Sequence, residues 1–241
     1  MYSFNRFSLL AFIFTGLNAL FGIIGIIVSI YSSDELLYLP MQLLIFGAIF
    51  DYLDGRIAKK SPTSSTLGTY SDSVGDVITF AILPGIMLLN APIAGNEVND
   101  LSSIMALGIA GFYSLCGWLR LIRFATNPTE IHFDGLPSPA AALLIGSSAI
   151  LATFDEMTWL FWPNGVPLTL LTIITGLLMV ITLSYPTPKR GKTPDMIAIS
   201  IAGLVVLFFV FFPHYFTLSF ILLIAILYTV FGPLYLRRTS K

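Results

Sequence analysis

Long apolar segments separated by short polar stretches run along the whole chain. Each segment holds about 17–25 residues, which is enough for a helix to cross or nearly cross a bilayer. The expected spans are 8–31, 38–58, 69–90, 101–123, 138–154, 166–184, 196–212 and 215–235. The pattern predicts an all-α fold, a polytopic membrane bundle of about eight transmembrane helices.

The composition supports a membrane protein and excludes several other classes. Hydrophobic residues make up 56% of the 241 residues and charged residues only 10%, too few for the surface of a soluble protein of this size. Cys116 is the only cysteine, so the chain forms neither an internal disulfide nor a cysteine-based zinc site. No repeat or long linker divides the sequence. We expect one membrane-embedded domain over 1–241, with a core of about 8–190 and two additional spans over about 196–235.

The charged residues near the ends of the spans predict how the bundle is oriented. Lysine and arginine occur only at alternate ends of the expected spans, as the positive-inside rule requires for cytoplasmic loops. They are Arg6, Arg56, Lys59, Lys60, Arg120, Arg123, Lys189, Arg190, Lys192, Arg237, Arg238 and Lys241. The charged residues of the opposite loops are all acidic, namely Asp34, Glu35, Glu97, Asp100, Asp155 and Glu156. Both termini are therefore expected in the cytoplasm, where the basic side suits anionic lipid headgroups or an anionic substrate; no nucleic acid is implied.

Two pairs of aspartates interrupt the apolar pattern in the second and third expected spans. Asp51 and Asp54 lie three residues apart, so both project from one face of a helix. The same holds for Asp72 and Asp76, which lie four residues apart. A short turn around Pro62 joins the two helices and places both pairs within about 9–15 Å of the turn. Four carboxylates are therefore expected at a similar depth, near the cytoplasmic surface.

Such a group of carboxylates indicates a cation site. An ionised carboxylate within a membrane costs about 3 kcal/mol on insertion scales, so four of them need a compensating charge. Oxygen ligands without histidine or thiolate favour magnesium, manganese or calcium over zinc or copper. A single intramembrane aspartate also serves as a helix–helix hydrogen-bonding group, but four at this spacing favour a metal. Gly55, Gly68, Gly75 and Ala58 keep the neighbouring faces small enough to admit a bulky ligand.

These residues fit a known sequence signature. The pattern D-x2-D-G-x2-A-R-x8-G-x3-D-x3-D resembles that of the CDP-alcohol phosphatidyltransferases. The chain matches it at Asp51, Asp54, Gly55, Ala58, Gly68, Asp72 and Asp76. Lys59 stands where the family has arginine, which keeps the positive charge but not the planar guanidinium.

The resemblance implies transfer of a lipid-phosphoryl group from a CDP-activated lipid to an alcohol, with release of CMP. It implies Mg²⁺ or Mn²⁺, as one or two ions on the diphosphate, and Asp76 as the base that deprotonates the acceptor. The implied metal ligands are Asp51, Asp54, Asp72 and Asp76. The implied nucleotide and CDP-lipid contacts are Asp51, Gly55, Ala58, Lys59, Gly68 and Asp72. A homodimer among membrane lipids is a further implication.

A second region resembles the serine-transferring branch of this family, the phosphatidylserine and archaetidylserine synthases. It contains RLIRF at 120–124, GLPSP at 135–139 and SYP at 184–186. The resemblance implies Arg120, Arg123 and Lys189 as ligands of the acceptor or of a phosphate. A basic residue at the end of a span also serves as an anchor at the membrane surface, and that alternative stays open here. Asn18 and Gly22 match the family's first span more loosely.

The leading hypothesis is transfer to serine from CDP-diacylglycerol or CDP-archaeol, at a cytoplasm-facing site in a multi-pass protein of the cell (plasma) membrane. Glycerol phosphate or inositol phosphate as acceptor is an alternative within the family, because such acceptors also need a basic pocket. A cation transporter with the aspartates in its pathway is an alternative of another class. It does not account for carboxylates and glycines on both sides of a short turn, and no inverted repeat accompanies them.

Overall fold

A computed structural model describes the chain over residues 6–31, 34–58, 72–91, 100–126, 133–157, 165–186 and 203–239. The main helices are α1 (Arg6–Tyr31), α2 (Leu39–Ala58), α4 (Leu83–Leu89), α5 (Asp100–Thr126), α6 (Ser138–Leu151), α8 (Val166–Val180) and α10 (Tyr215–Thr239). The shorter elements are the 3-10 helices η1 (Asp34–Leu36) and η3 (Asp155–Met157), the π-helix η2 (Val77–Ile82), helical segments at 72–76 and 203–211, and the strands β1 (Phe133–Asp134) and β2 (Ser184–Tyr185).

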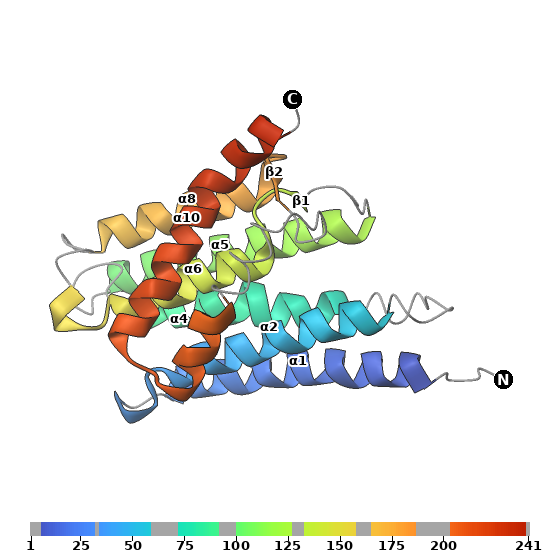
Figure 1. Ribbon diagram of the computed structural model, residues 1–241. Coiled ribbons are helices and arrows are strands. Elements are labelled where there is room, and N and C mark those ends of the chain that lie inside the picture. The colour runs from blue at the N-terminus through green and yellow to red at the C-terminus, as the bar shows by residue number, and fades with distance from the viewer. Residues whose placement is uncertain are drawn as a thin grey trace.

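The predicted all-α membrane fold is confirmed. Each expected span contains a helix within the described residues (Figure 1). Four helical segments are long and apolar enough to cross a membrane, namely Leu9–Tyr31, Asp72–Leu89, Ser103–Thr126 and Tyr215–Tyr235. α2 has a comparable length but carries Asp51, Asp54 and Arg56, and α6 and α8 are shorter. The exact number of spans and the side of the membrane on which each loop lies stay predictions.

Small residues let α1, α2 and the helix that contains Thr79 approach one another closely. A Cβ added at Gly22 would lie 2.5 Å from the Thr79 hydroxyl oxygen, and one added at Gly47 would lie 2.6 Å from Thr79 Cγ2. A Cβ added at Gly75 would lie 3.4 Å from Asn18 Nδ2. Helices with small residues at their contacts can touch along their backbones. This close packing brings polar side chains of α1 next to the aspartates.

A π-helical segment follows the second aspartate pair. η2 begins directly after Asp76 and continues into α4, which contains Pro84. Pro84 has no N–H for the carbonyl of Phe80 four residues earlier, and the Tyr113 hydroxyl of α5 donates to that carbonyl at 3.1 Å. The apolar pattern of the sequence gives no signal for this segment. π-helical turns often occur at functional sites, and this one adjoins Asp76.

α6 lies at the centre of the bundle. Most of its residues are buried, and it packs against α2, α4, α8 and α10. α10 crosses obliquely over it, as Figure 1 shows. The core around α6 includes Met41, Leu44, Leu83, Leu88, Leu144, Ile145 and Leu218. A helix that is apolar on nearly all sides is typical of such a buried position. α6 ends at Leu151, so the expected span over 138–154 is wrong at its end.

Two short strands join segments that are far apart in the sequence. β1 pairs antiparallel with β2, in the register Phe133↔Tyr185 and Asp134↔Ser184. The expected span over 166–184 is therefore wrong at its end, because α8 stops at Val180. The physical reason is that the residues after α8 bond to the chain after β1, for example through Gly135 N–H to Leu183 O at 2.8 Å.

Replacing Gly47 by alanine is expected to destabilise the bundle. The new Cβ would lie 2.6 Å from Thr79 Cγ2 and 3.0 Å from Asn18 Oδ1. Overpacking of this kind costs about 1–3 kcal/mol, which lowers the thermal unfolding midpoint of detergent-purified protein by several degrees. Gly108→Ala on α5 is the matched control, since a Cβ there meets nothing within 4 Å. Equal midpoints for the two variants would contradict the close packing.

Candidate active site

Asp51 on α2 converges with Asp72 and Asp76 on the following helix. One carboxylate oxygen from each lies within 4.8 Å of the others. All three residues are partly buried, and Asp72 Oδ1 has no hydrogen-bond partner among the described residues. Carboxylates this close repel one another and lose hydration, and a bound divalent cation offsets both effects. The oxygen-only ligand set and the unpartnered Asp72 oxygen fit a hard cation such as Mg²⁺ or Mn²⁺.

Asp54 lies on the same helix as Asp51 but outside this carboxylate cluster. Its side chain is 3% exposed, and its Oδ2 accepts a hydrogen bond from the Thr15 hydroxyl of α1 at 2.8 Å. The structure therefore brings three of the four predicted metal ligands together and attaches the fourth to α1. Metal ligation by Asp54 stays a prediction.

Asn18, which matched the family's first span loosely in the sequence and was given no role there, is a further functional candidate. It lies in the middle of α1, is fully buried, and donates from Nδ2 to Asp76 Oδ1 at 3.0 Å. The Thr79 hydroxyl donates to the Asn18 carbonyl at 3.0 Å, which fixes the backbone at this point. The amide therefore holds one oxygen of Asp76 in place. The available signal in the sequence was a lone amide within a long apolar span, because such a group needs a partner in a membrane.

Arg120 of α5 reaches the same site. Its side chain is 6% exposed, its Nη1 donates to Ser138 Oγ, and its charge interacts with that of Asp76. Its Nε is buried and has no partner within the part of the chain that the structure describes. A guanidinium N–H left open beside a cation site is an anion-binding group. The position suits the predicted contact with the acceptor or a phosphate, which stays a prediction.

Arg123, one turn further along α5, bonds to main-chain carbonyls. Its guanidinium donates to the carbonyls of Val180 and Met179 at the end of α8 and to that of Asp134 in β1. The last carbonyls of a helix lack partners within it, and an arginine supplies both the bonds and a favourable charge. Gly135 packs here with φ +82°, and a Cβ on it would lie 2.4 Å from Met179 O. Arg123 thus joins α5, α8 and β1, and its role as a substrate ligand stays a prediction.

The predicted nucleotide contacts are described only in part. Gly55 lies on an exposed face of α2, where an added Cβ would meet nothing within 4 Å. That open space suits a ligand that approaches the backbone. Ala58 is the last residue of α2. Lys59, Gly68 and Lys189 lie outside the described residues.

A cavity of about 560 Å³ lies at the other end of the bundle, away from the aspartates. Its lining includes Ser29 near the end of α1, Asn90 after α4, and Asp155 and Glu156 in η3. The Asn90 amide donates to Ser29 O at 2.6 Å, so this group already bonds within the protein. The carboxylate cluster with Asn18 and Arg120, rather than this cavity, is the candidate active site.

A comparison with known families shows where this arrangement belongs. The sequence model of the family described as CDP-alcohol phosphatidyltransferase matches residues 8–171, from α1 into the start of α8. The chain belongs to the CDP-alcohol phosphatidyltransferase family. The matched region contains the whole carboxylate cluster as well as Asn18 and Arg120. The resemblance stated from the aspartate signature is therefore confirmed, and the protein is an enzyme of this transferase family.

Three relatives are similar to the chain over most of its length. A CDP-diacylglycerol–serine O-phosphatidyltransferase of Methanocaldococcus jannaschii is 32% identical over 96% of both chains. One of Helicobacter pylori is 29% identical over 75% of this chain and 73% of its own. An archaetidylserine synthase of Methanothermobacter thermautotrophicus is 31% identical over 70% of this chain and 66% of its own.

The family match ends within α8, so β2 and α10 lie beyond it. The matched residues 8–171 include the carboxylate cluster and the Arg120–Ser138 hydrogen bond. The M. jannaschii relative aligns over 96% of this chain, and therefore over most of the segment beyond the match as well. At least one relative therefore extends over most of the segment from β2 to α10.

Replacing Asn18 by alanine is expected to lower transferase activity by about 10–100-fold, the size of effect that contacts behind metal ligands have. The reason is the loss of the 3.0 Å hydrogen bond to Asp76 Oδ1. Initial rates over a Mg²⁺ titration measure the effect and show whether metal affinity falls with it. Asn90→Ala removes an amide from the far end of the bundle and serves as the control. Activity of Asn18→Ala within twofold of the wild type would contradict a role for the amide.

Proposed function

We propose that the enzyme transfers the lipid-phosphoryl group of CDP-diacylglycerol or CDP-archaeol to the hydroxyl of L-serine, with release of CMP. The observation that carries the proposal is the convergence of Asp51, Asp72 and Asp76 beside a buried Arg120 in a member of this family. The names of the most similar relatives support serine as the acceptor. The proposed setting is the cytoplasmic side of the cell membrane, and the proposed assembly is a homodimer.

The reaction forms a bond between the serine hydroxyl oxygen and the lipid-bearing phosphorus, and it breaks the bond from that phosphorus to CMP. Asp51, Asp72 and Asp76, with the predicted ligand Asp54, would hold a divalent cation, which when bound would neutralise charge on the diphosphate. Asp76 accepts the proton of the serine hydroxyl as the oxygen attacks. The Asn18 amide keeps the Asp76 carboxylate oriented for this transfer.

Arg120 is the proposed partner of the anionic group of the acceptor. Its Nε–H is buried and unpaired within the described residues, and its charge acts on Asp76. A serine carboxylate bound there would hold the serine hydroxyl near the base, which is how positioning contributes to rate. Ser138 accepts from Nη1 and so fixes the plane of the guanidinium. Glycerol phosphate or inositol phosphate would use the same group, so the acceptor has to be separated by assay.

A cation transporter, the alternative of another class, has less support. Intramembrane carboxylates alone are compatible with it. The family to which the chain belongs is one of transferases, and an open guanidinium beside the carboxylates suits an anionic substrate better than a permeating cation. The enzyme is therefore the function that the site supports best.

The decisive test is release of CMP by the purified protein with a CDP-lipid and Mg²⁺ or Mn²⁺. Serine, glycerol 3-phosphate and inositol 1-phosphate are offered separately. Release with serine alone is expected, and removal of the metal with EDTA should abolish it. Release only with another acceptor would reject serine and keep the family reaction. No release with any acceptor, from folded and metal-loaded protein, would contradict the proposal as a whole.

The proposed roles of the aspartates predict different losses in two variants. Asp76→Asn is expected to lower turnover by about 100–10,000-fold, the usual contribution of a general base, while metal-dependent CDP-lipid binding is largely kept. Asp72→Ala removes a carboxylate of the cluster altogether and is expected to lose both binding and turnover, whereas asparagine at position 76 keeps an oxygen that can ligate the cation. Equilibrium binding of the CDP-lipid in the presence of Mg²⁺, together with CMP release, measures both quantities. Equal loss of binding in the two variants would contradict this division of roles.

A further inference from the structure

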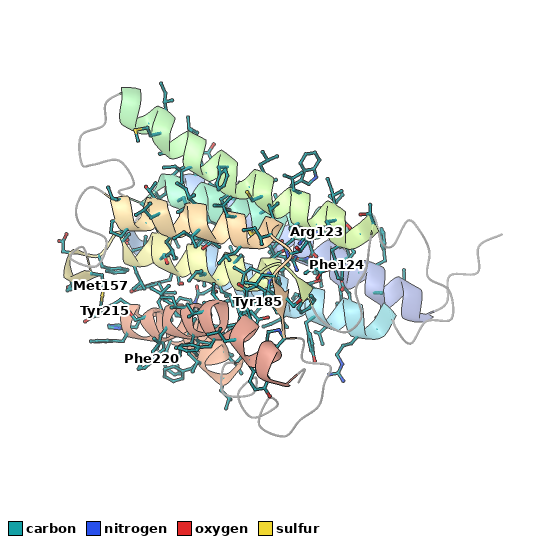
Figure 2. The ribbon with its side chains drawn as sticks, turned by 90° about the horizontal axis from the view of Figure 1, so that it is seen from above. Arg123, Phe124, Met157, Tyr185, Tyr215 and Phe220 are labelled. Carbon is teal, nitrogen blue, oxygen red and sulfur yellow. The ribbon has the colours of Figure 1, made fainter. Side chains whose placement is uncertain are left out.

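α10 and the segment around β2 exchange hydrogen bonds through two tyrosines. The Tyr185 hydroxyl donates to the carbonyl of Thr229 at 3.2 Å, and the Tyr228 hydroxyl donates to the carbonyl of Pro186 at 3.1 Å. The two tyrosine rings lie 5.7 Å apart. Figure 2 shows Tyr185 beside α10, toward the end of the bundle that carries Arg123. α10 and the β2 segment therefore each donate one hydrogen bond to the other and accept one from it.

A proline explains why a carbonyl of α10 is open to Tyr185. Pro233 lies inside α10 and has no N–H, so the Thr229 carbonyl four residues earlier lacks its helical donor. A carbonyl without a partner is costly within a membrane protein, and the fully buried Tyr185 supplies the missing donor. A Cβ on Gly232 would lie 3.2 Å from Pro186 Cδ and from the Tyr185 ring. The sequence of α10 thus fits close contact with this segment.

The β2 segment, which is bonded to α10, is connected through β1 to Ser138 and Arg120, the proposed binding group for the acceptor. Tyr185 pairs with Phe133 of β1, and the chain after β1 leads to Ser138, whose hydroxyl accepts from Arg120. Within the described residues, the carboxylate cluster contains no side chain of β2 or α10. The bonds of α10 to the β2 segment therefore connect, through the strand pair, to the segment that carries Ser138, the partner of Arg120.

We propose that Tyr185 and Tyr228 are positioning residues for the acceptor, which fix the paired strands against α10 and thereby hold Arg120 where it binds the acceptor's carboxylate. This inference rests on the proposed function. It gives α10, which lies beyond the matched residues 8–171, a part in acceptor recognition. The competing explanation is that α10 only anchors the protein in the membrane.

Tyr185→Phe and Tyr228→Phe test the inference, because each keeps the ring and removes only the hydroxyl. KM for serine is expected to rise about threefold to tenfold, the effect of one hydrogen bond, with kcat and KM for the CDP-lipid within twofold of the wild type. Tyr215→Phe is the matched control, since it makes the same change at the far end of α10 (Figure 2). It should leave all three constants unchanged.

The outcomes separate the inference from the proposed function. Metal-dependent binding of the CDP-lipid, measured on the same samples, is expected to be unchanged because the carboxylate cluster is untouched. An unchanged KM for serine in both tyrosine variants, or an equal loss in all constants and in binding, would overturn the inference. If the wild type uses another anionic acceptor in place of serine, serine is wrong as the proposed acceptor. The inference is then tested by KM for that acceptor, which should rise in Tyr185→Phe and Tyr228→Phe and stay unchanged in Tyr215→Phe.

Discussion

Carboxylates within 4.8 Å of one another in an apolar bundle repel each other and lose hydration, and much of the structure offsets that cost. α1 supplies two donors, the Thr15 hydroxyl to Asp54 and the Asn18 amide to Asp76. α5 supplies the positive charge of Arg120. Glycines at the helix contacts let these donors come close enough to bond. α1, which by its hydropathy is an ordinary membrane anchor, is thus part of the site.

The two arginines of the RLIRF segment differ in what they contact. Arg120 points into the protein, where it is 6% exposed and keeps one donor free of partners among the described residues. This burial is incompatible with the alternative that it is a surface anchor. Arg123 uses its donors on the carbonyls at the end of α8 and in β1. One arginine is therefore available to a substrate, and the other holds together the backbone around it.

Local signals predicted the helices and the convergence of the aspartates. Hydropathy marks each span, and the spacing of Asp51, Asp72 and Asp76 on two successive expected spans predicts the convergence that the structure shows. Features that depend on a distant partner escaped prediction. Arg123 reaches the carbonyl of Val180, 57 residues away, and the β1–β2 pair joins segments on either side of α6 and α8. The hydropathy pattern of one segment contains no information on which backbone carbonyls of a distant segment will lie within hydrogen-bonding distance.

Pro84 and Pro233 lie four residues after Phe80 and Thr229 and offer no N–H to the carbonyls of these residues, and a tyrosine from another element donates to each carbonyl. Inside α10, the proline leaves the Thr229 carbonyl as the acceptor that the tyrosine uses. Loss of the tyrosine alone would leave a bare carbonyl in an apolar environment, and loss of the proline alone would give the tyrosine a competitor for its acceptor. Evolution should accept both changes together more readily than either one alone. The residue pairs expected to covary among relatives are Pro84 with Tyr113 and Pro233 with Tyr185.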